Sequence, residues 1–368
     1  MKIPVCEPSL GPKELEYVAD CVKTNWISSK GKYVTEFEER FSAFCGAKYG
    51  VSTSSGTTAI HLALATLGVG RGDEVVLPTL THCCCANMVV LTGARPILVD
   101  SEDETWNIDV DKIVEKLTGR TKVIMPVHLY GHPADMDPIL DLAEDRDLCV
   151  VADSAEAHGA EYKGQRVGGM GDLECFSFYA NKIITTGEGG MIVTNNQELA
   201  EKAAMLRDQA YEKERRFLHR VIGFNYRMTN LQAAIGVAQM EKIDRFIEAR
   251  RRNAHLYNSL LEQVEGIKLP PETEWAKNVY WMYSILVEDS FGLSRDELAS
   301  YLKERGVETR PFFYPIHLQP IYAENYQWGS CPVAEELSQQ GMNLPSAATL
   351  GRKEIEYVTS CLSAAKRR

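Results

Sequence analysis

Residues 177–190 read SFYANKIITTGEGG, and Lys182 stands between an apolar run and a glycine-rich turn. A single lysine is usually a solvated surface residue. This lysine, however, directly follows a stretch that reads as a buried strand, and apolar neighbours favour the uncharged, nucleophilic amine. Gly187, Gly189 and Gly190 permit close backbone packing after it. The segment therefore predicts a chemically active lysine just beyond the end of a strand.

Two earlier segments could complete a site around this lysine. Residues 149–158, CVVADSAEAH, read as an apolar strand that ends in Asp153. Active sites of open α/β sheets lie at the carboxyl ends of strands, where a carboxylate can pair with a protonated ring nitrogen. A turn or helix-cap role for Asp153 is the alternative. Residues 54–59, SSGTTA, join a strand to a helix and present free N–H groups suited to phosphate, although similar caps begin many helices.

Short apolar runs alternate with amphipathic stretches through the first two thirds of the chain. This alternation predicts an α/β fold with a mostly parallel sheet. The predicted strands are 49–53, 74–77, 96–99, 123–127, 149–152, 174–178 and 191–194. The predicted helices include 57–67, 109–117, 138–145, 197–207 and 230–251.

The pattern changes after residue 251. A strand at 279–287 is predicted there, and Ser294 is a suitable N-cap for one of the helices. The predicted helices are 253–263, 294–305, 333–341 and 353–366. These elements predict a smaller α+β lobe, reached through the long helix 230–251. We expect a large domain over 1–242 and a small domain over 243–368.

Net charge, cysteine spacing and the length of apolar runs argue against several classes of function. The chain has 368 residues and a formal net charge of −11, which argues against a broad surface for nucleic acid or an anionic membrane. Its ten cysteines form no CxxC pair, so no metal site is predicted, and most are expected to be small buried residues in a reducing cytoplasm. No secretory signal and no apolar run of membrane-spanning length is expected.

The chain resembles, nearly end to end, the DegT/DnrJ/StrS family of nucleotide-sugar aminotransferases, which depend on pyridoxal phosphate (PLP). The resemblance is carried in order by SSGTTAIHLAL, GDEVVLPTLT, DSAEAHGA, SFYANKIITTGEGGM and GFNYRMTNLQAAIG. It implies the type I fold of aspartate aminotransferase, with a large mixed sheet and a smaller C-terminal domain.

The resemblance also implies roles for individual residues. Lys182 is expected to hold PLP as a Schiff base and to shuttle protons, and Asp153 is expected to keep the pyridinium nitrogen protonated. Asn225, in FNYR, is expected to reach the cofactor phosphate of a neighbouring subunit, which implies a homodimer with shared sites. The remaining phosphate ligands implied are Gly56, Thr57 and Ser177.

Two positions depart from the commonest pattern of the family. Glu156 stands where many relatives carry glutamine beside the phenolic oxygen of the cofactor, and a carboxylate there implies a shared proton. His82 stands where an aromatic ring usually stacks on the cofactor; imidazole can also stack, and a purely structural histidine is the alternative. For the following triplet, Cys83–Cys85, packing is expected instead of chemistry.

Substrate residues are suggested by weaker likenesses. The segments GVETRPFFYPIHLQPIY, MNLPS and ETWNID resemble the perosamine-synthase branch of the family. By that resemblance Arg310 and His317 lie near the nucleotide or the sugar, with a surface salt bridge as the alternative for Arg310. Trp26, Ser28 and Ser29, in the segment TNWISSKG, are expected to touch the sugar nucleotide or else to form a turn packed on its own domain.

The expected reaction is transfer of the amino group of L-glutamate to GDP-4-keto-6-deoxy-D-mannose, giving GDP-perosamine and 2-oxoglutarate. A 4-aminotransferase acting on a dTDP- or UDP-linked 4-keto-6-deoxy sugar is the nearest alternative. A sugar 3-dehydratase of the same family would carry histidine in place of Lys182. A non-catalytic sensor that keeps the fold is the alternative from another class.

Overall fold

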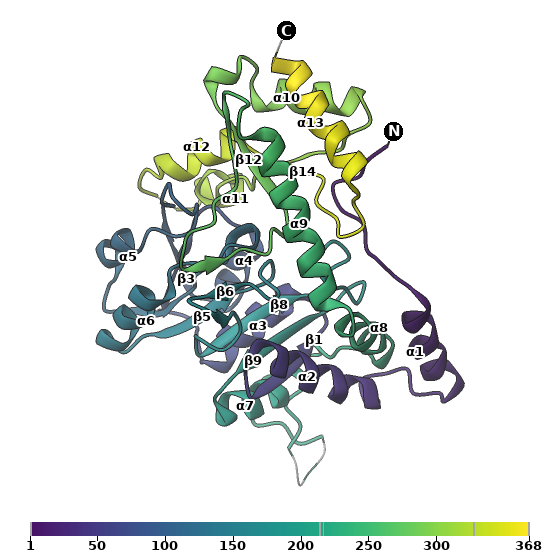
Figure 1. Cartoon of the computed structure of the whole chain (residues 1–368). Coiled ribbons are helices and arrows are strands. Elements are labelled where there is room, and N and C mark those ends of the chain that lie inside the picture. Colours follow the sequence, from purple (N-terminus) through teal and green to yellow (C-terminus); the bar gives the residue numbers. More distant parts are fainter. Residues whose placement is uncertain (1, 213–214, 216, 327, 367–368) are drawn as a thin grey trace.

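The computed structural model describes residues 2–212, 215, 217–326 and 328–366, and its centre is a seven-stranded sheet (Figure 1). The spatial order of the strands is β1-β9-β8-β5-β4-β2-β3, and β9 alone runs antiparallel to its neighbours. This confirms the expected large, mostly parallel, mixed sheet. The bounds are β1 Tyr49–Thr53, β2 Glu74–Pro78, β3 Arg95–Val99, β4 Thr121–Ile124, β5 Cys149–Asp153, β8 Leu173–Ser177 and β9 Gly190–Thr194.

Helices cover both faces of this sheet because successive strand residues point to opposite sides. In β8, for example, Cys175 packs into one apolar cluster and Phe176 into another. On the Cys175 side lie α3 Gly56–Thr66, α4 Cys84–Leu91 and α7 Gln197–Arg207. On the other side lie α2 Lys32–Cys45, α5 Val110–Lys116, α6 Met136–Asp145 and α8 Asn230–Met240, with α1 Pro12–Lys23 packed against α8.

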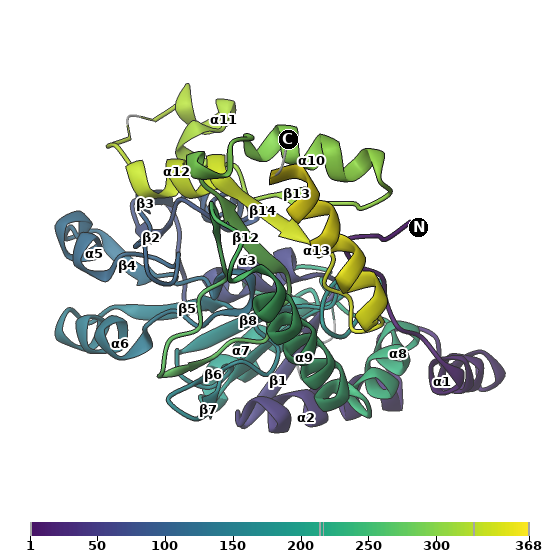
Figure 2. The same cartoon turned by 45° about the horizontal axis from the view of Figure 1, so that its top comes forward.

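The C-terminal lobe is built on a separate four-stranded antiparallel sheet, ordered β10-β12-β14-β13. Figure 2 shows α9, α10 and α13 around it. Ile3, from the other end of the chain, is buried in the same core and pairs with Val307. The bounds are α9 Ile243–Leu261, β10 Ile267–Lys268, β12 Tyr283–Val287, α10 Arg295–Glu304, β13 Arg310–Pro311, α11 Pro320–Ala323, α12 Pro332–Gln340, β14 Gly341–Leu344 and α13 Arg352–Lys366. A small third sheet holds β6 Glu161–Tyr162, β7 Gln165–Arg166 and β11 Ala276–Lys277.

The single long helix predicted over 230–251 is wrong, because the chain forms α8 and α9 with a corner between them. Lys242 leaves the helical region, with φ −124° and ψ 0°. Its ammonium group pairs with the buried carboxylate of Glu14, which also accepts a hydrogen bond from Gln239. These contacts fix the corner on α1, so that α8 packs on the large sheet and α9 continues to Leu261 through the region predicted as a second helix.

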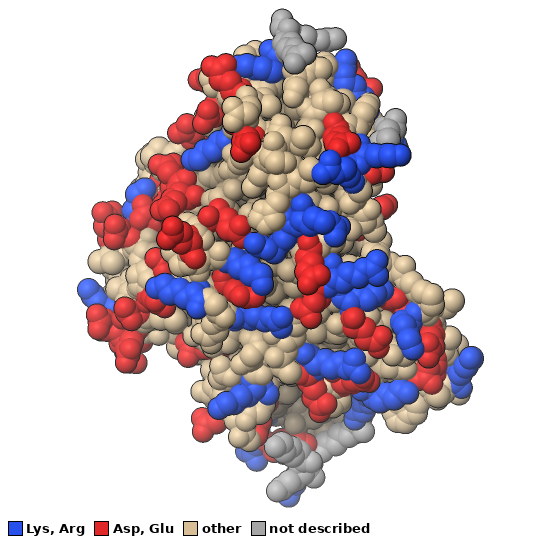
Figure 3. All heavy atoms as spheres, in the orientation of Figure 1, with Lys and Arg blue, Asp and Glu red and all other residues tan. Residues whose placement is uncertain are grey.

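The other predicted elements of the large sheet are found within a few residues of their expected ends, and Ser294 caps α10 as expected. Helices α1, α2 and α4 are not among those predicted. All ten cysteines are free. None of the described helices is both long and apolar enough to cross a bilayer. On the face shown in Figure 3 acidic and basic side chains alternate without forming one broad basic field.

Candidate active site

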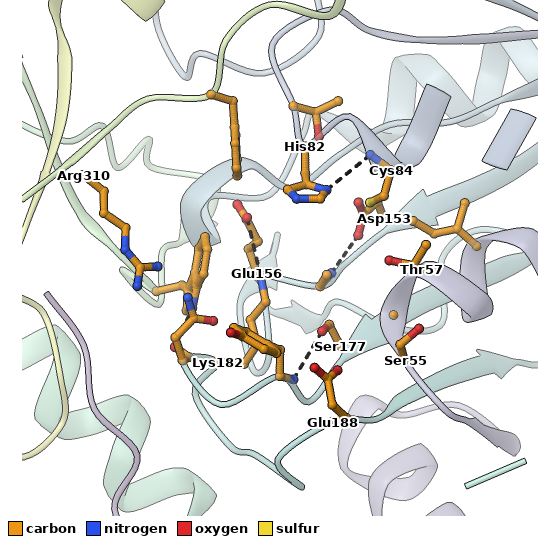
Figure 4. A pocket seen from close by; sticks show the side chains of 18 residues that line it. Ser55, Thr57, His82, Cys84, Asp153, Glu156, Ser177, Lys182, Glu188 and Arg310 are labelled. Atoms are coloured by element: carbon orange, nitrogen blue, oxygen red, sulfur yellow. Dashed lines mark hydrogen bonds and ion pairs between the residues drawn. The ribbon is translucent and has the colours of Figure 1, made fainter. Parts of the chain in front are cut away.

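A cavity of about 430 Å³ opens at the carboxyl ends of β2, β5 and β8 and at the first turn of α3. This is the edge of the sheet where the carboxyl ends of parallel strands direct their side chains toward ligands. Figure 4 shows Lys182, Glu156, Asp153 and His82 around the cavity. The lining also includes Ser55, Gly56, Thr57, Cys84, Ser177, Glu188, Trp281, Arg310 and Phe313.

Lys182 lies in the loop between β8 and β9, and its side chain is only 10% exposed. Its Nζ lies 3.6 Å from Oε1 of Glu156 and 3.6 Å from the centroid of the Trp281 ring. The loop is held by backbone hydrogen bonds, among them Lys182 N–H to the Tyr179 carbonyl at 2.9 Å. Gly190 lets this loop approach α3, because a Cβ there would lie 2.3 Å from the Ser55 carbonyl oxygen. The amine is therefore fixed inside the cavity.

Asp153 ends β5 and is 5% exposed. One carboxylate oxygen, Oδ1, accepts a hydrogen bond from the Ala155 N–H at 3.0 Å. The other, Oδ2, lies 3.1 Å from the Cys85 thiol. A buried carboxylate held by neutral donors is suited to pair with a cation in the cavity.

The first turn of α3 forms the polar end of the cavity. Ser55 is the N-cap, and its side chain accepts a hydrogen bond from the Thr58 N–H at 3.1 Å. The first N–H groups of a helix have no partner within it, so those of Gly56 and Thr57 are available to an anion. Gly56 is required here, because a Cβ would lie 2.6 Å from Cβ of Ser177. The turn is thus a phosphate cradle closed on one side by β8.

Glu156 follows β5 and is 5% exposed. Its Oε2 accepts a 2.7 Å hydrogen bond from the Tyr130 N–H, and Tyr130 has the left-handed φ of 53°. Burial raises the pKa of Glu156 to about 7, although Lys182 and the Tyr130 N–H act in the opposite direction. Near neutral pH this side chain can therefore hold or release a proton beside Lys182.

His82 lies above Asp153 and Glu156 in the view of Figure 4. Its Nδ1 accepts a hydrogen bond from the Cys84 N–H at 3.2 Å, and its ring meets Phe313 edge to face at 5.8 Å. The side chain of Cys84, acting as a hydrogen-bond partner and through its charge, raises the pKa of His82 against the effect of burial. The ring thus borders the cavity, as a stacking residue would.

Several residues predicted for the site do not line this cavity in the single chain. Trp26 is 58% exposed, and Ser28 and Ser29 border a separate surface hollow with Asp208 and Arg227. Asn225 is exposed beside Tyr226, whose carbonyl accepts the Ser54 N–H. Their roles stay predictions, and that of Asn225 requires a second subunit.

The two predicted residues of the C-terminal lobe differ in their placement. Arg310, in β13, lines the cavity and lies at the opposite end from Thr57 in Figure 4. His317 is buried outside the cavity lining; its Nδ1 lies 2.7 Å from Oγ1 of Thr79, and its Nε2 lies 3.3 Å from Glu335. His317 therefore contacts Thr79 and Glu335 within the protein, and its predicted role in substrate binding stays a prediction.

Several lining residues are not among those predicted from the sequence, and three of them are Trp281, Phe313 and Glu188. Trp281 and Phe313 come from the C-terminal lobe, and no local pattern marks them. Glu188 stands in the GEGG turn that the sequence analysis quoted for its glycines alone.

The residues present fit PLP by their chemistry. The cavity combines an anion cradle, a lysine amine and a buried carboxylate, which match the phosphate, the aldehyde and the ring nitrogen of this cofactor. In addition, Oδ1 of Asn181 is buried at the cavity without a hydrogen-bond partner among the described residues.

Comparison with known proteins agrees with this reading. The model of the DegT/DnrJ/EryC1/StrS aminotransferase family matches residues 8–363. The chain is 46% identical to GDP-perosamine synthase of Escherichia coli O157:H7, over 98% of both chains. It is 44% identical to GDP-perosamine synthase of Caulobacter vibrioides, over 98% of this chain and 97% of that protein. A sugar aminotransferase structure from Streptococcus pneumoniae, solved in its PLP form, superposes with a TM-score of 0.94 at 26% identity, covering 100% of this chain and 99% of that one.

Proposed function

The chain belongs to the DegT/DnrJ/EryC1/StrS aminotransferase family, and we propose that it transfers the amino group of L-glutamate to GDP-4-keto-6-deoxy-D-mannose. The products are GDP-perosamine and 2-oxoglutarate, and the place of action is the cytoplasm. The observation that carries the proposal is one cavity that joins Lys182, Asp153 and the first turn of α3. The names of the two relatives, matched over nearly their whole length, support the choice of substrate.

PLP, when bound, supplies an electron sink that lets a proton leave the carbon next to the nitrogen. The chain itself supplies the base that moves this proton. The Lys182 side chain is long enough to reach the carbons on both sides of that nitrogen, and the Trp281 ring at 3.6 Å keeps its amine directed into the cavity. Asp153 binds and orients the protonated ring nitrogen, and the α3 turn holds the phosphate.

Glu156 can hold or release a proton beside Lys182. Because burial raises the pKa of Glu156 to about 7, its neutral and charged forms are both populated near neutral pH. It can then bind the phenolic oxygen of the cofactor as a hydrogen-bond donor, which a fully ionised carboxylate could not do.

We place the nucleotide sugar at the end of the cavity bounded by Arg310, whose guanidinium is suited to a phosphate of the nucleotide. A homodimer is part of the proposal, because Trp26, Ser28, Ser29 and Asn225 lie outside the cavity of a single chain. Leu15, Val22 and Trp26 are 73%, 60% and 58% exposed, and together they offer apolar surface near these residues for a second subunit.

The test is a reaction with identified products. The PLP-loaded protein is incubated with L-glutamate and, separately, with GDP-, dTDP- and UDP-linked 4-keto-6-deoxy sugars, and the products are identified by mass. We expect amination of the GDP sugar and parallel initial-rate lines. Preference for a dTDP or UDP sugar would replace the substrate assignment, and failure to convert glutamate would remove the aminotransferase function.

Matched variants locate the activity. Lys182→Ala is expected to abolish turnover, whereas Lys353→Ala, at an exposed position on α13, is expected to leave it unchanged. Equal activity of the two variants would contradict the proposed role of Lys182.

A further inference from the structure

Asp153 has a buried hydrogen-bond donor that the proposed reaction does not use. Cys85 is 0% exposed, and its thiol lies 3.1 Å from Oδ2 of Asp153. The opposite oxygen is already bound by the Ala155 N–H. Each carboxylate oxygen therefore has a donor inside the protein.

The position of Cys85 follows from the topology. Cys85 lies in the first turn of α4, which follows β2, and only β4 separates β2 from β5 in the sheet. The start of α4 is thereby held over the end of β5, where Asp153 lies. On its other side the Cys85 sulfur lies 3.8 Å from Oγ1 of Thr81, so the thiol is enclosed between two polar groups.

We propose that Cys85 is a positioning residue, whose thiol donates a hydrogen bond that keeps the Asp153 carboxylate directed at the cofactor ring. The inference rests on the proposed function, because the ring nitrogen of PLP is the partner of Asp153 there. Removing a donor from a buried charge costs more than removing a neutral hydrogen bond. A carboxylate deprived of this donor would be less firmly oriented, so that its contact with the ring nitrogen would weaken.

The thiol stays protonated, as a donor must. The contact with the Cys84 side chain, complete burial and the charge of Asp153 hold the pKa of Cys85 well above its usual range. Cys84 lines the cavity and differs, because its contacts with the side chains of Cys85 and His82 lower its pKa to about 6. The two adjacent thiols therefore have different roles, and only Cys85 serves as a donor to Asp153.

A packing role for Cys85 predicts a different ranking of variants. Cys85 also belongs to the apolar cluster beneath α3 and α4. If packing alone mattered, alanine would be tolerated better than serine, because a hydroxyl is costlier to bury than a methyl group. If the donor matters, serine keeps it and alanine loses it.

The experiment uses the full chain loaded with PLP, as wild type, Cys85→Ser and Cys85→Ala. The dissociation constant of PLP is measured from cofactor absorbance, with a thermal melt of each protein to verify folding. We expect Cys85→Ala to bind PLP about tenfold more weakly, the ratio that corresponds to about 1.4 kcal/mol, and Cys85→Ser to stay within about twofold of wild type.

Cys45 provides the matched control, because it is buried and free and its thiol forms no hydrogen bond with any described residue. There we expect serine to lower the melting temperature more than alanine, and neither change to alter PLP affinity. If Cys85→Ala fails to fold, the pair Cys85→Thr and Cys85→Val, nearly equal in volume, repeats the comparison with and without a hydroxyl.

The outcomes separate this inference from the proposed function. The role of Cys85 alone would be overturned if the wild type bound PLP and Cys85→Ala bound it equally well. It would also be overturned if the wild type bound PLP and the serine and alanine variants lost the same amount of affinity. A wild-type protein that takes up no PLP would overturn both.

Discussion

Replacing Glu156 by glutamine should remove a pH dependence from the stability of the cofactor-free protein. The folded pKa of Glu156 is raised to about 7 by burial, whereas the usual value is 4.5. Between these two values the folded protein keeps a proton that the unfolded chain has lost. The free energy of unfolding therefore falls as the pH rises through this window and stays lower above it. Glutamine remains uncharged throughout.

The magnitude follows from the two pKa values. Each pKa unit corresponds to about 1.4 kcal/mol, so the ionised carboxylate costs about 3 kcal/mol in total. About 2 kcal/mol of this accrues between roughly pH 5.5 and pH 8.5, because part of the loss occurs at lower pH. Glu156→Gln should therefore gain about 2 kcal/mol relative to wild type across this interval.

Urea unfolding of wild type and Glu156→Gln at the two pH values gives the change in unfolding free energy with pH for each protein. The contributions of the other titrating groups cancel when the two changes are subtracted. Glu115→Gln, an exposed change on α5, serves as the control and should follow wild type. If Glu156→Gln and wild type lost stability in parallel as the pH rose, the reasoning about a buried, protonated Glu156 would be refuted.

Two further changes test the cradle and the packing of the large domain. Gly56→Ala should weaken PLP binding by at least tenfold in an absorbance titration, because the new Cβ would lie 2.6 Å from Cβ of Ser177. Gly119→Ala is the control: its new Cβ would meet no atom within 4 Å, and this variant should bind PLP normally. Arg207→Ala should lower the free energy of unfolding by about 3 kcal/mol in urea, because the largely buried carboxylate of Glu38 on α2 loses its cationic partner and keeps only hydrogen bonds from Ser52. Arg352→Ala removes one side of an exposed ion pair and should cost well under 1 kcal/mol.

The parts of the fold that local patterns control could be predicted from the sequence. Apolar runs of strand length located the seven strands of the large sheet, and the residues at their ends led to Asp153 and Lys182. The corner at Lys242 could not be predicted, because it depends on a contact with Glu14, more than two hundred residues away.

The same limit applies within the site. Trp281 reaches Lys182 only because the C-terminal lobe docks over the end of the sheet, and the contact of Cys85 with Asp153 needs the order of the strands. His317, which the resemblance placed near the substrate, contacts Thr79 and is not among the residues that line the cavity, so its role stays a prediction.

The central claim is that Lys182 is the residue to which PLP becomes covalently attached. Treating the PLP-loaded protein with sodium borohydride makes the attachment permanent, and mass spectrometry of a protease digest then locates it. The account predicts the cofactor mass on the peptide that contains Lys182 and its loss after prior incubation with L-glutamate. A label on another lysine, or none, would contradict the account.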